Sequence, residues 1–202
     1  MKIAGVLLAG GQSQRMGGGD KCLRLLAGRP ILAHVIERAR PQVMSLVLNA
    51  NGDPARFATF GLPVVADNIE GFAGPLAGVL AGLDWVAVHH PDATHVASFA
   101  TDAPFLPRDL VAALRDGLRQ GHYDLACAAS DGRAHPVFGL WPLALRAELR
   151  HALLSGIRKV DQWTGQYRLI EVEFPAAPID PFFNANRPED LEAAERLVAR
   201  AV

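Results

Sequence analysis

The sequence predicts an α/β protein with a mostly parallel sheet covered by helices on both faces. Short apolar runs of the length of buried strands alternate with segments whose apolar residues recur at helical spacing. Four such strand-then-helix units succeed one another in the first 120 residues, and units of this kind form parallel sheets with right-handed crossovers. A chain of 202 residues without repeats, linkers or low-complexity tails predicts a single domain over residues 1–202.

The predicted strands before residue 130 are runs of apolar side chains bounded by polar or glycine residues. They cover residues 3–9, 43–48, 62–66, 95–100 and 123–129. Between the first two, residues 23–26 predict a short extended piece and residues 28–30 a turn. Carboxyl ends of parallel strands meet at one edge of a sheet, so the loops that follow these strands are expected to gather there.

The predicted helices lie between the strands and carry their own start and stop signals. They cover residues 31–40, a segment that begins at Asp53-Pro54, and residues 75–88 and 107–120. Pro41 ends the first of them, and Asp53 with Pro54 suits the first turn of the second. Beyond Ser130 the pattern is less regular, and predicts four further segments: an extended piece at 136–140, a helix at 143–154, a strand at 167–174 and a helix at 189–201.

The composition argues against a global electrostatic field that would recruit nucleic acid or an anionic membrane. The net charge is −1, with 20 basic and 21 acidic residues, so any phosphate binding depends on local placement. Cys22 and Cys127 are too far apart for a metal knuckle or redox pair and are expected as free thiols of a reducing compartment. The apolar stretch 72–88 contains Asp84 and falls short of a spanning helix. We expect a cytoplasmic protein.

The first predicted strand ends in a glycine-rich loop that has the properties of a polyphosphate cradle. Glycines such as Gly10 and Gly11 allow backbone N–H groups to approach an anion closely. Arg15 suits bidentate contact with phosphate, and Lys21 supplies a point charge. The loop is not a Walker A motif, because Lys21 precedes a cysteine, and the dinucleotide fingerprint G-x-G-x-x-G cannot be placed on it.

In order and spacing, this loop resembles the nucleotidyltransferase signature L-A-G-G-x-x-x-R-M-G-x-x-K, with one extra residue before the lysine. The matching letters are LAGG at 8–11, RMGG at 15–18 and DK at 20–21. This variant is most similar to the molybdenum cofactor guanylyltransferases. The resemblance implies a Rossmann-like nucleotidyltransferase fold, with residues 1–104 mainly nucleotide-binding and residues 130–190 mainly acceptor-binding. A purely structural glycine-rich turn is the alternative.

Short polar residues stand where three predicted strands stop: Asn49, Asp67 and Asp102. Asp102 is the sole acid of its segment, and its Thr-Asp-Ala-Pro context resembles the metal-binding element of the family. Because Mg²⁺ binds one or two carboxylates plus substrate phosphates, one aspartate suffices, and we expect Mg²⁺ as the cofactor. A carboxylate at Asp67 can accept both adjacent donors of guanine, or it contacts the ribose. The resemblance assigns Asn49 to the same nucleoside.

The resemblance implies further contacts with GTP at the first strand and at the helix predicted over residues 75–88. Backbone groups of Leu8 and Ala9 are expected to face the base, with Gly10 and Gly11 at the phosphates. The Gly-Pro-Leu-Ala-Gly element that ends at Gly78 places a helix N-terminus toward the nucleotide. Glycines at positions 74, 78 and 82 also indicate a helix face that packs tightly on its neighbour.

The resemblance is looser in the second half of the chain, where it implies acceptor-binding residues. These are His135, Arg158, Lys159, Asn184 and Asn186. The implied reaction transfers GMP from GTP to the phosphate of molybdenum-molybdopterin and releases pyrophosphate. Arg15, Lys21 and Asp102 are its expected catalytic residues. Chaperones of molybdoenzymes or cofactor-insertion proteins are expected partners, whereas nucleic acid and membranes are not.

Three alternatives stay open at this point. The chain could be a cytidylyltransferase that acts on the same cofactor, which differs in base preference. It could be a sugar-phosphate nucleotidyltransferase, which differs in acceptor. It could also be a non-catalytic nucleotide-binding protein that delivers the cofactor, although the expected cations and the metal aspartate are all present.

Overall fold

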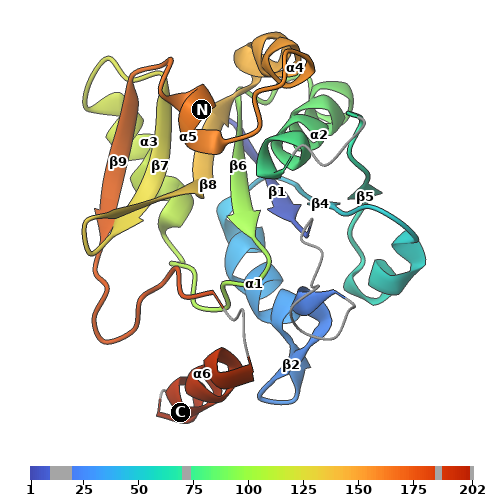
Figure 1. Cartoon of the computed structure of the whole chain (residues 1–202), viewed down its shortest axis with the longest axis vertical. Helices are drawn as coiled ribbons and strands as arrows, with labels where there is room; N and C mark the ends of the chain where they lie inside the picture. Colours follow the sequence, from blue (N-terminus) through green and yellow to red (C-terminus); the bar gives the residue numbers. More distant parts are fainter. Residues whose placement is uncertain (10–19, 70–73, 185–187, 201–202) are drawn as a thin grey trace.

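A computed structural model describes residues 1–9, 20–69, 74–184 and 188–200 of the chain. Seven of the described strands form one sheet, which lies between two sets of helices (Figure 1). The order across the sheet is β5-β4-β1-β6-β8-β7-β9, and every neighbouring pair is parallel except the two that involve β8. The predicted α/β class with a mostly parallel sheet is confirmed.

The strands are short and mostly buried, as runs of branched and small apolar residues favour. They are β1 Ile3–Leu8, β4 Leu46–Asn49, β5 Val64–Val65, β6 His95–Ala100, β7 Leu125–Ser130, β8 Arg133–Pro142 and β9 Leu169–Phe174. A separate two-stranded hairpin consists of β2 Leu25–Leu26 and β3 Arg29–Pro30. Within β1, Ile3 and Leu7 enter one hydrophobic core and Ala4 and Val6 the other.

The helices cover both faces of the sheet, as predicted. On the face of Leu7 lie α1 Ile31–Ala39 and α3 Leu110–Arg119, joined by Ala194 of α6 Pro188–Arg200. On the face of Val6 lie α2 Pro75–His89, α4 Arg146–Leu154 and α5 Val160–Thr164. Within the described part of the chain, no helix has the length and apolarity that crossing a membrane requires.

Several predicted elements differ from the observed ones in extent. The predicted strand 62–66 contracts to Val64–Val65 at the sheet edge, where the preceding Pro63 lacks an N–H group. The helix predicted to begin at Asp53-Pro54 is a 3₁₀ helix, Pro54–Phe60, whose first turn Asp53 caps by accepting from the Ala55 N–H. The extended piece predicted over 23–26 is confirmed from Arg24 to Leu26, whereas Leu23 belongs to the 3₁₀ turn Lys21–Leu23 before β2.

The main difference lies in β8, which is ten residues long rather than the predicted piece at 136–140. It runs antiparallel between β6 and β7, and so separates the parallel part of the sheet around β1 from the β7-β9 pair. Nothing local distinguishes an inserted antiparallel strand from a parallel one. The short helix α5 was also not predicted, and α3 begins three residues later than expected, at Leu110.

One buried hydroxyl fastens β8 to β6. Ser98 on β6 is 1% exposed, and its Oγ donates to the Val137 carbonyl at 2.5 Å. The same Oγ accepts hydrogen bonds from Trp141 Nε1 at 2.7 Å and from the Gly139 N–H at 3.2 Å. Because Trp141 is itself 3% exposed, its indole N–H has little access to water as a replacement partner.

Replacement of Ser98 by alanine should therefore destabilise the fold. We expect Ser98→Ala to lower the free energy of unfolding by about 1–3 kcal/mol, because the indole N–H of Trp141 then stays buried without an acceptor. Urea unfolding followed by tryptophan fluorescence measures the change. Ser155→Ala, at an exposed serine, is the control and should change the free energy by less than about 0.5 kcal/mol. Equal effects of the two substitutions would contradict this reading.

Candidate active site

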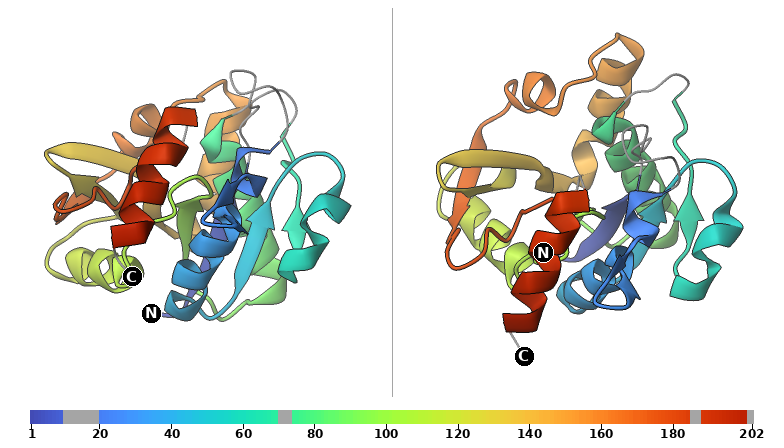
Figure 2. Two further views of the ribbon diagram at one scale, coloured as in Figure 1. Left: turned by 90° about the horizontal axis from the view of Figure 1, so that it is seen from below. Right: turned by 60° about the horizontal axis from the view of Figure 1, so that its bottom comes forward.

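The candidate site lies at the carboxyl ends of β1, β4 and β6. From β1 the chain proceeds to β4 on one side and later to β6 on the other, so β1 flanks a topological switch point, where open α/β sheets bind ligands. Leu8 pairs with Asn49 of β4 and with Ala100 of β6. Thr101 Oγ1 donates to the Leu8 carbonyl at 3.1 Å, which fixes the ends of β1 and β6 together. Figure 2 views this edge from below.

Asn49 and Asp67 meet at this edge, as their positions after neighbouring strands predict. Asn49 Nδ2 donates to Asp67 Oδ1 at 2.9 Å and lies 3.3 Å from the Val65 carbonyl. Asn49 is 3% exposed, and the Asp67 side chain is half-buried. This hydrogen bond thus orients the Asp67 carboxylate at the carboxyl edge of the sheet.

Asn51 completes this arrangement, and the sequence reasoning missed it. Its Nδ2 donates to Asp67 Oδ2 at 2.8 Å, and its Oδ1 accepts from the Asp67 backbone N–H at 2.8 Å. One amide therefore binds both the backbone and the side chain of Asp67. The only sequence signal was its place two residues after Asn49, just beyond the end of β4.

Gly78 allows helix α2 to approach this edge closely. A Cβ atom at Gly78 would lie 2.8 Å from Leu8 Cδ2 and would collide with Asn49 Oδ1. One turn further along, a Cβ at Gly82 would lie 2.7 Å from Val6 Cβ. The tight helix face predicted from the glycine spacing is confirmed at both positions. The absence of a side chain at Gly78 thus leaves room for Asn49 in its observed position.

Asp102 follows β6, on the other side of the switch point, and is half-buried. Burial raises the pKa of the Asp102 carboxyl, and the nearby charge of Lys21 opposes that rise. Within the described residues no cluster of three His, Cys, Asp or Glu side chains could hold a metal. A single hard carboxylate fits Mg²⁺, which takes its remaining ligands from water and substrate phosphates.

Cys22 lies beside this pair without the properties of a reactive thiol. It is 3% exposed, and burial raises the pKa of its thiol to about 12. The negative charges of Asp20 and Asp102 add to the increase in pKa, and a hydrogen bond with Thr101 opposes it. Cys127 is buried as well, with a pKa of about 12 for the same main reason. Both residues are free thiols, as expected.

Among the predicted acceptor residues, His135 belongs to a compact polar and aromatic group. Its Nε2 lies 2.7 Å from Ser130 Oγ, which in turn donates to Asp180 Oδ1 at 3.0 Å. The His135 ring packs on Phe182 with centroids 4.7 Å apart. Because Ser130 donates to Asp180, its oxygen accepts the Nε2–H of His135. Burial lowers the pKa of His135, and the charge of Asp180 opposes that shift.

The other predicted acceptor residues occupy different surroundings. Arg158 Nη1 donates to the carbonyls of Leu153, at the end of α4, and of Ile157. The Arg158 carbonyl lies 3.5 Å from where a Cβ of Gly74 would stand, so this segment borders the start of α2. Lys159 precedes α5, and both Lys159 and Asn184 are exposed. Four further predicted site residues lie outside the described part of the chain: Gly10, Gly11, Arg15 and Asn186.

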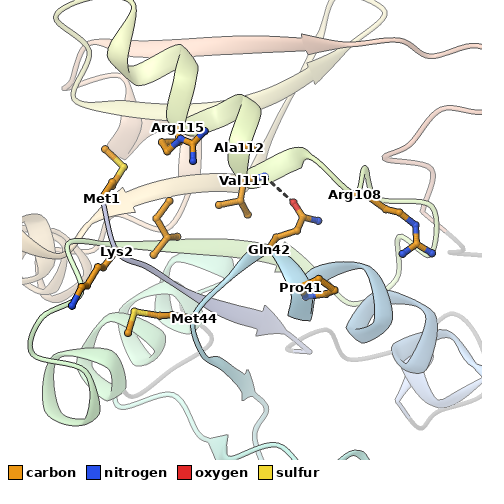
Figure 3. Close-up of a pocket in the computed structure, with 10 residues that line it drawn as sticks. Met1, Lys2, Pro41, Gln42, Met44, Arg108, Val111, Ala112 and Arg115 are labelled. Atoms are coloured by element: carbon orange, nitrogen blue, oxygen red, sulfur yellow. Dashed lines mark hydrogen bonds between the residues drawn. The ribbon is translucent and has the colours of Figure 1, made fainter.

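A cavity of about 580 Å³ lies at the opposite edge of the sheet (Figure 3). Residues from the start of β1, from the segment before β4 and from α3 line it, among them Met1, Gln42, Met44 and Arg115. Gln42 accepts a hydrogen bond from the Val111 N–H at 2.9 Å across this cavity. None of the lining residues comes from the carboxyl ends of the strands, so the cavity is separate from the candidate site.

Replacement of Gly78, which lies against Leu8 and Asn49, by alanine should affect both the packing of α2 and the affinity for nucleotide. The added methyl group displaces Asn49 or Leu8, so we expect a loss of about 1–3 kcal/mol in stability, as overpacking causes, and nucleotide affinity lowered by at least about tenfold. The matched control is Gly82→Ala, which collides with Val6 within the core and should lower stability without a comparable loss of affinity. Thermal unfolding and calorimetric titration with nucleotide separate the two effects, and equal affinities would contradict the assignment.

Comparisons with known proteins agree with this geometry. The model of the MobA-like NTP transferase domain matches residues 5–169. A molybdenum cofactor guanylyltransferase of Bradyrhizobium sp. (strain ORS 278) is 61% identical over 198 residues, which is 98% of this chain and 93% of that protein. Relatives with the same name include one from Mesorhizobium japonicum, which is 50% identical over 97% of this chain and 96% of its own length.

Two solved structures support the fold. Molybdopterin-guanine dinucleotide biosynthesis protein A from Archaeoglobus fulgidus has a TM-score of 0.75 and 24% identity, and the alignment covers 99% of this chain and 100% of that one. Rv0371c from Mycobacterium tuberculosis H37Rv, in complex with manganese, has a TM-score of 0.68 and 17% identity over 97% and 99% of the two chains. With the site geometry and the close relatives, we conclude that this chain belongs to the molybdenum cofactor guanylyltransferase family of MobA-like NTP transferases.

Proposed function

We propose that the protein transfers GMP from GTP to the phosphate of the molybdenum-molybdopterin cofactor, forming the guanine dinucleotide cofactor and pyrophosphate. The observation that carries this proposal is the Asp67 carboxylate, which two amides orient at the carboxyl edge of the sheet, where Asp102 and Lys21 also lie. Full-length relatives that are named for guanylyl transfer support the choice of base and acceptor.

Guanine recognition depends on the lone pairs that Asp67 has left. Each carboxylate oxygen can accept two hydrogen bonds, and each here accepts one from an asparagine amide. The carboxylate can therefore still accept the N1–H and the 2-amino group of guanine. Cytosine offers no such pair of donors, which disfavours the cytidylyl alternative. Backbone groups of Leu8 and Ala9, fixed by the Ala9 N–H bond to the Asn49 carbonyl at 2.9 Å, border the same position.

The phosphates are proposed to bind at Lys21 and Asp102, with Gly10, Gly11 and Arg15 from the glycine-rich loop. A divalent cation bound at Asp102, which we propose to be Mg²⁺, would neutralise charge on the triphosphate and on the leaving pyrophosphate. The manganese in the Mycobacterium tuberculosis structure supports a divalent cation in a protein of this fold. Lys21 adds a fixed positive charge beside Asp102. Electrostatic stabilisation and alignment are the catalytic effects expected.

The acceptor is proposed to bind in the second half of the chain, within residues 130–190. His135, Arg158, Lys159, Asn184 and Asn186 are the proposed contacts. An attacking phosphate is already an anion, so the reaction needs no general base. We further propose a cytoplasmic location and transfer of the product to molybdoenzyme chaperones or cofactor-insertion proteins.

Base selectivity is the direct test of this function. We expect GTP with Mg²⁺ to raise the melting temperature of the protein, because ligand binding to the native state stabilises it. CTP, ATP and UTP at the same concentration are the controls and should raise it far less. A shift with CTP alone would move the assignment to cytidylyl transfer, and no shift with any nucleotide would contradict the proposed donor site.

Removal of the charges at the phosphate end should strongly lower turnover without unfolding the protein. We expect Lys21→Ala and Asp102→Ala each to lower turnover by at least about 100-fold, the loss typical of a removed electrostatic contact to the transition state. Because burial disfavours the charged form of Asp102, its removal should not lower the stability of the ligand-free protein. Pyrophosphate release and thermal unfolding measure the two quantities. Full activity in a folded variant of either would refute the mechanism.

A further inference from the structure

We propose that Arg56 is a positioning residue that connects the two ends of the nucleotide site. This inference rests on the proposed function, because it assigns Arg56 a role in binding GTP. Arg56 comes from the 3₁₀ helix Pro54–Phe60, outside every motif that the sequence pointed to. It contacts the segment that carries Lys21 and the loop that carries Asn51, and so links the phosphate end to the nucleoside end.

At the phosphate end, Arg56 forms an ion pair with Asp20, the residue before Lys21. Its Nε lies 2.5 Å from Asp20 Oδ2, and both side chains are mostly buried, with 30% and 21% exposed. Among the described residues, Arg56 Nε is nevertheless the buried side-chain polar atom without an aligned hydrogen bond. The N–H direction therefore misses the carboxylate, and the contact is chiefly one of charge. Such a pair, partly shielded from water, is stronger than an exposed one.

At the nucleoside end, the same guanidinium donates to two backbone carbonyls. Arg56 Nη2 binds the Asn51 carbonyl at 2.5 Å, and Nη1 binds the Asp53 carbonyl at 3.0 Å. Asn51 in turn holds Asp67 through both the backbone N–H and the carboxylate. The path from Asp20 to Asp67 thus consists of one ion pair and successive hydrogen bonds through Arg56 and Asn51.

The local structure holds Arg56 in this position. Gly52 has a φ of +83°, and a Cβ there would lie 2.9 Å from Arg56 Nη1, so a larger residue would be strained and would also push the guanidinium away. The guanidinium carbon lies 4.8 Å from the centroid of the Phe57 ring, which is 1% exposed. A planar guanidinium can donate to both carbonyls through its two Nη atoms while its charge faces Asp20, whereas the point charge of a lysine cannot fix these contacts together.

The consequence is that removal of Arg56 should loosen both ends of the site. Calorimetric titrations with guanosine, with pyrophosphate plus Mg²⁺ and with GTP plus Mg²⁺ separate the ends. We expect Arg56→Ala to weaken binding of guanosine and of pyrophosphate by at least about threefold each, within the range of couplings between contacting groups. Asp20→Asn removes only the ion pair, and should weaken pyrophosphate while guanosine binds as in the wild type. Arg56→Lys should restore part of the pyrophosphate affinity and none of the guanosine affinity.

A double-mutant cycle with Lys21→Ala distinguishes positioning from a general loss of stability. We compare the factor by which Lys21→Ala lowers the affinity for GTP in two backgrounds. If Arg56 holds the Lys21 segment, this factor is at least about threefold smaller in Arg56→Ala than in the wild type. A merely structural arginine gives additive losses. Arg29→Ala, which removes an exposed ion pair with Glu37, is the matched control and should leave all three affinities unchanged.

The outcomes separate this inference from the proposed function. Suppose that the wild type binds GTP. Unchanged affinities of Arg56→Ala for the three ligands, or additive losses in the double-mutant cycle, would then overturn the role of Arg56 and leave the proposed function intact. Failure of the wild type to bind GTP would overturn both. If Arg56→Ala does not fold, Asp20→Asn decides the question alone. Equal losses of affinity for guanosine and pyrophosphate in this variant, or no loss of affinity for either, would contradict a link that acts through the ion pair.

Discussion

Helix α2 lies so close to β1 and β4 that no side-chain carbon fits at Gly78 or Gly82, and the rest of the site depends on the contact at Gly78. The contact at Gly82 brings the helix against Val6, and the contact at Gly78 confines the side chains of Leu8 and Asn49. From this position Asn49 Nδ2 donates to Asp67 Oδ1 at 2.9 Å. Core packing thus fixes a polar group several contacts away, because a close-packed interior transmits displacements rather than absorbing them.

The charges of the site are arranged locally, as a chain of net charge −1 requires. Asp20 and Asp102 both lie near Lys21 and Cys22, and Arg56 offsets the charge of Asp20. Asp102 is left with a raised pKa, which means that its negative charge is not fully stabilised by its protein neighbours. The divalent cation that we propose to bind at Asp102 would supply positive charge beside this carboxylate.

Much of this could be predicted from the sequence, for reasons that are local. The apolar runs at β1 and β6 and the polar residues that follow Leu48, Ala66 and Thr101 are properties of neighbouring residues. Their meeting at one edge follows from parallel pairing alone. The antiparallel insertion of β8 was beyond reach, because strand pairing depends on distant residues such as Ser98 and Trp141.

Asn51 and Arg56 were beyond reach for the same reason. Asn51 contributes to the site through its hydrogen bond to Asp67, which is 16 residues away. Arg56 contributes through its ion pair with Asp20, which lies in a different segment. In isolation each is an ordinary loop or surface residue, and neither belongs to the motifs by which the family is identified. Residues that touch the nucleotide are constrained by its chemistry, which a motif records. Residues that hold them in place are constrained only by the three-dimensional path between segments.

The reaction itself explains why positioning should matter so much here. Both reactants are phosphates, so the nucleophile needs no deprotonation, and the Nε2 of His135 in the proposed acceptor region is engaged with Ser130 Oγ. With little acid–base chemistry to perform, the protein can accelerate transfer mainly by alignment and by fixed charge. Alignment requires the guanine and the α-phosphate to be held by parts of the chain that do not move independently. Arg56 meets that requirement, because it contacts both Asp20, next to Lys21, and Asn51, which binds Asp67.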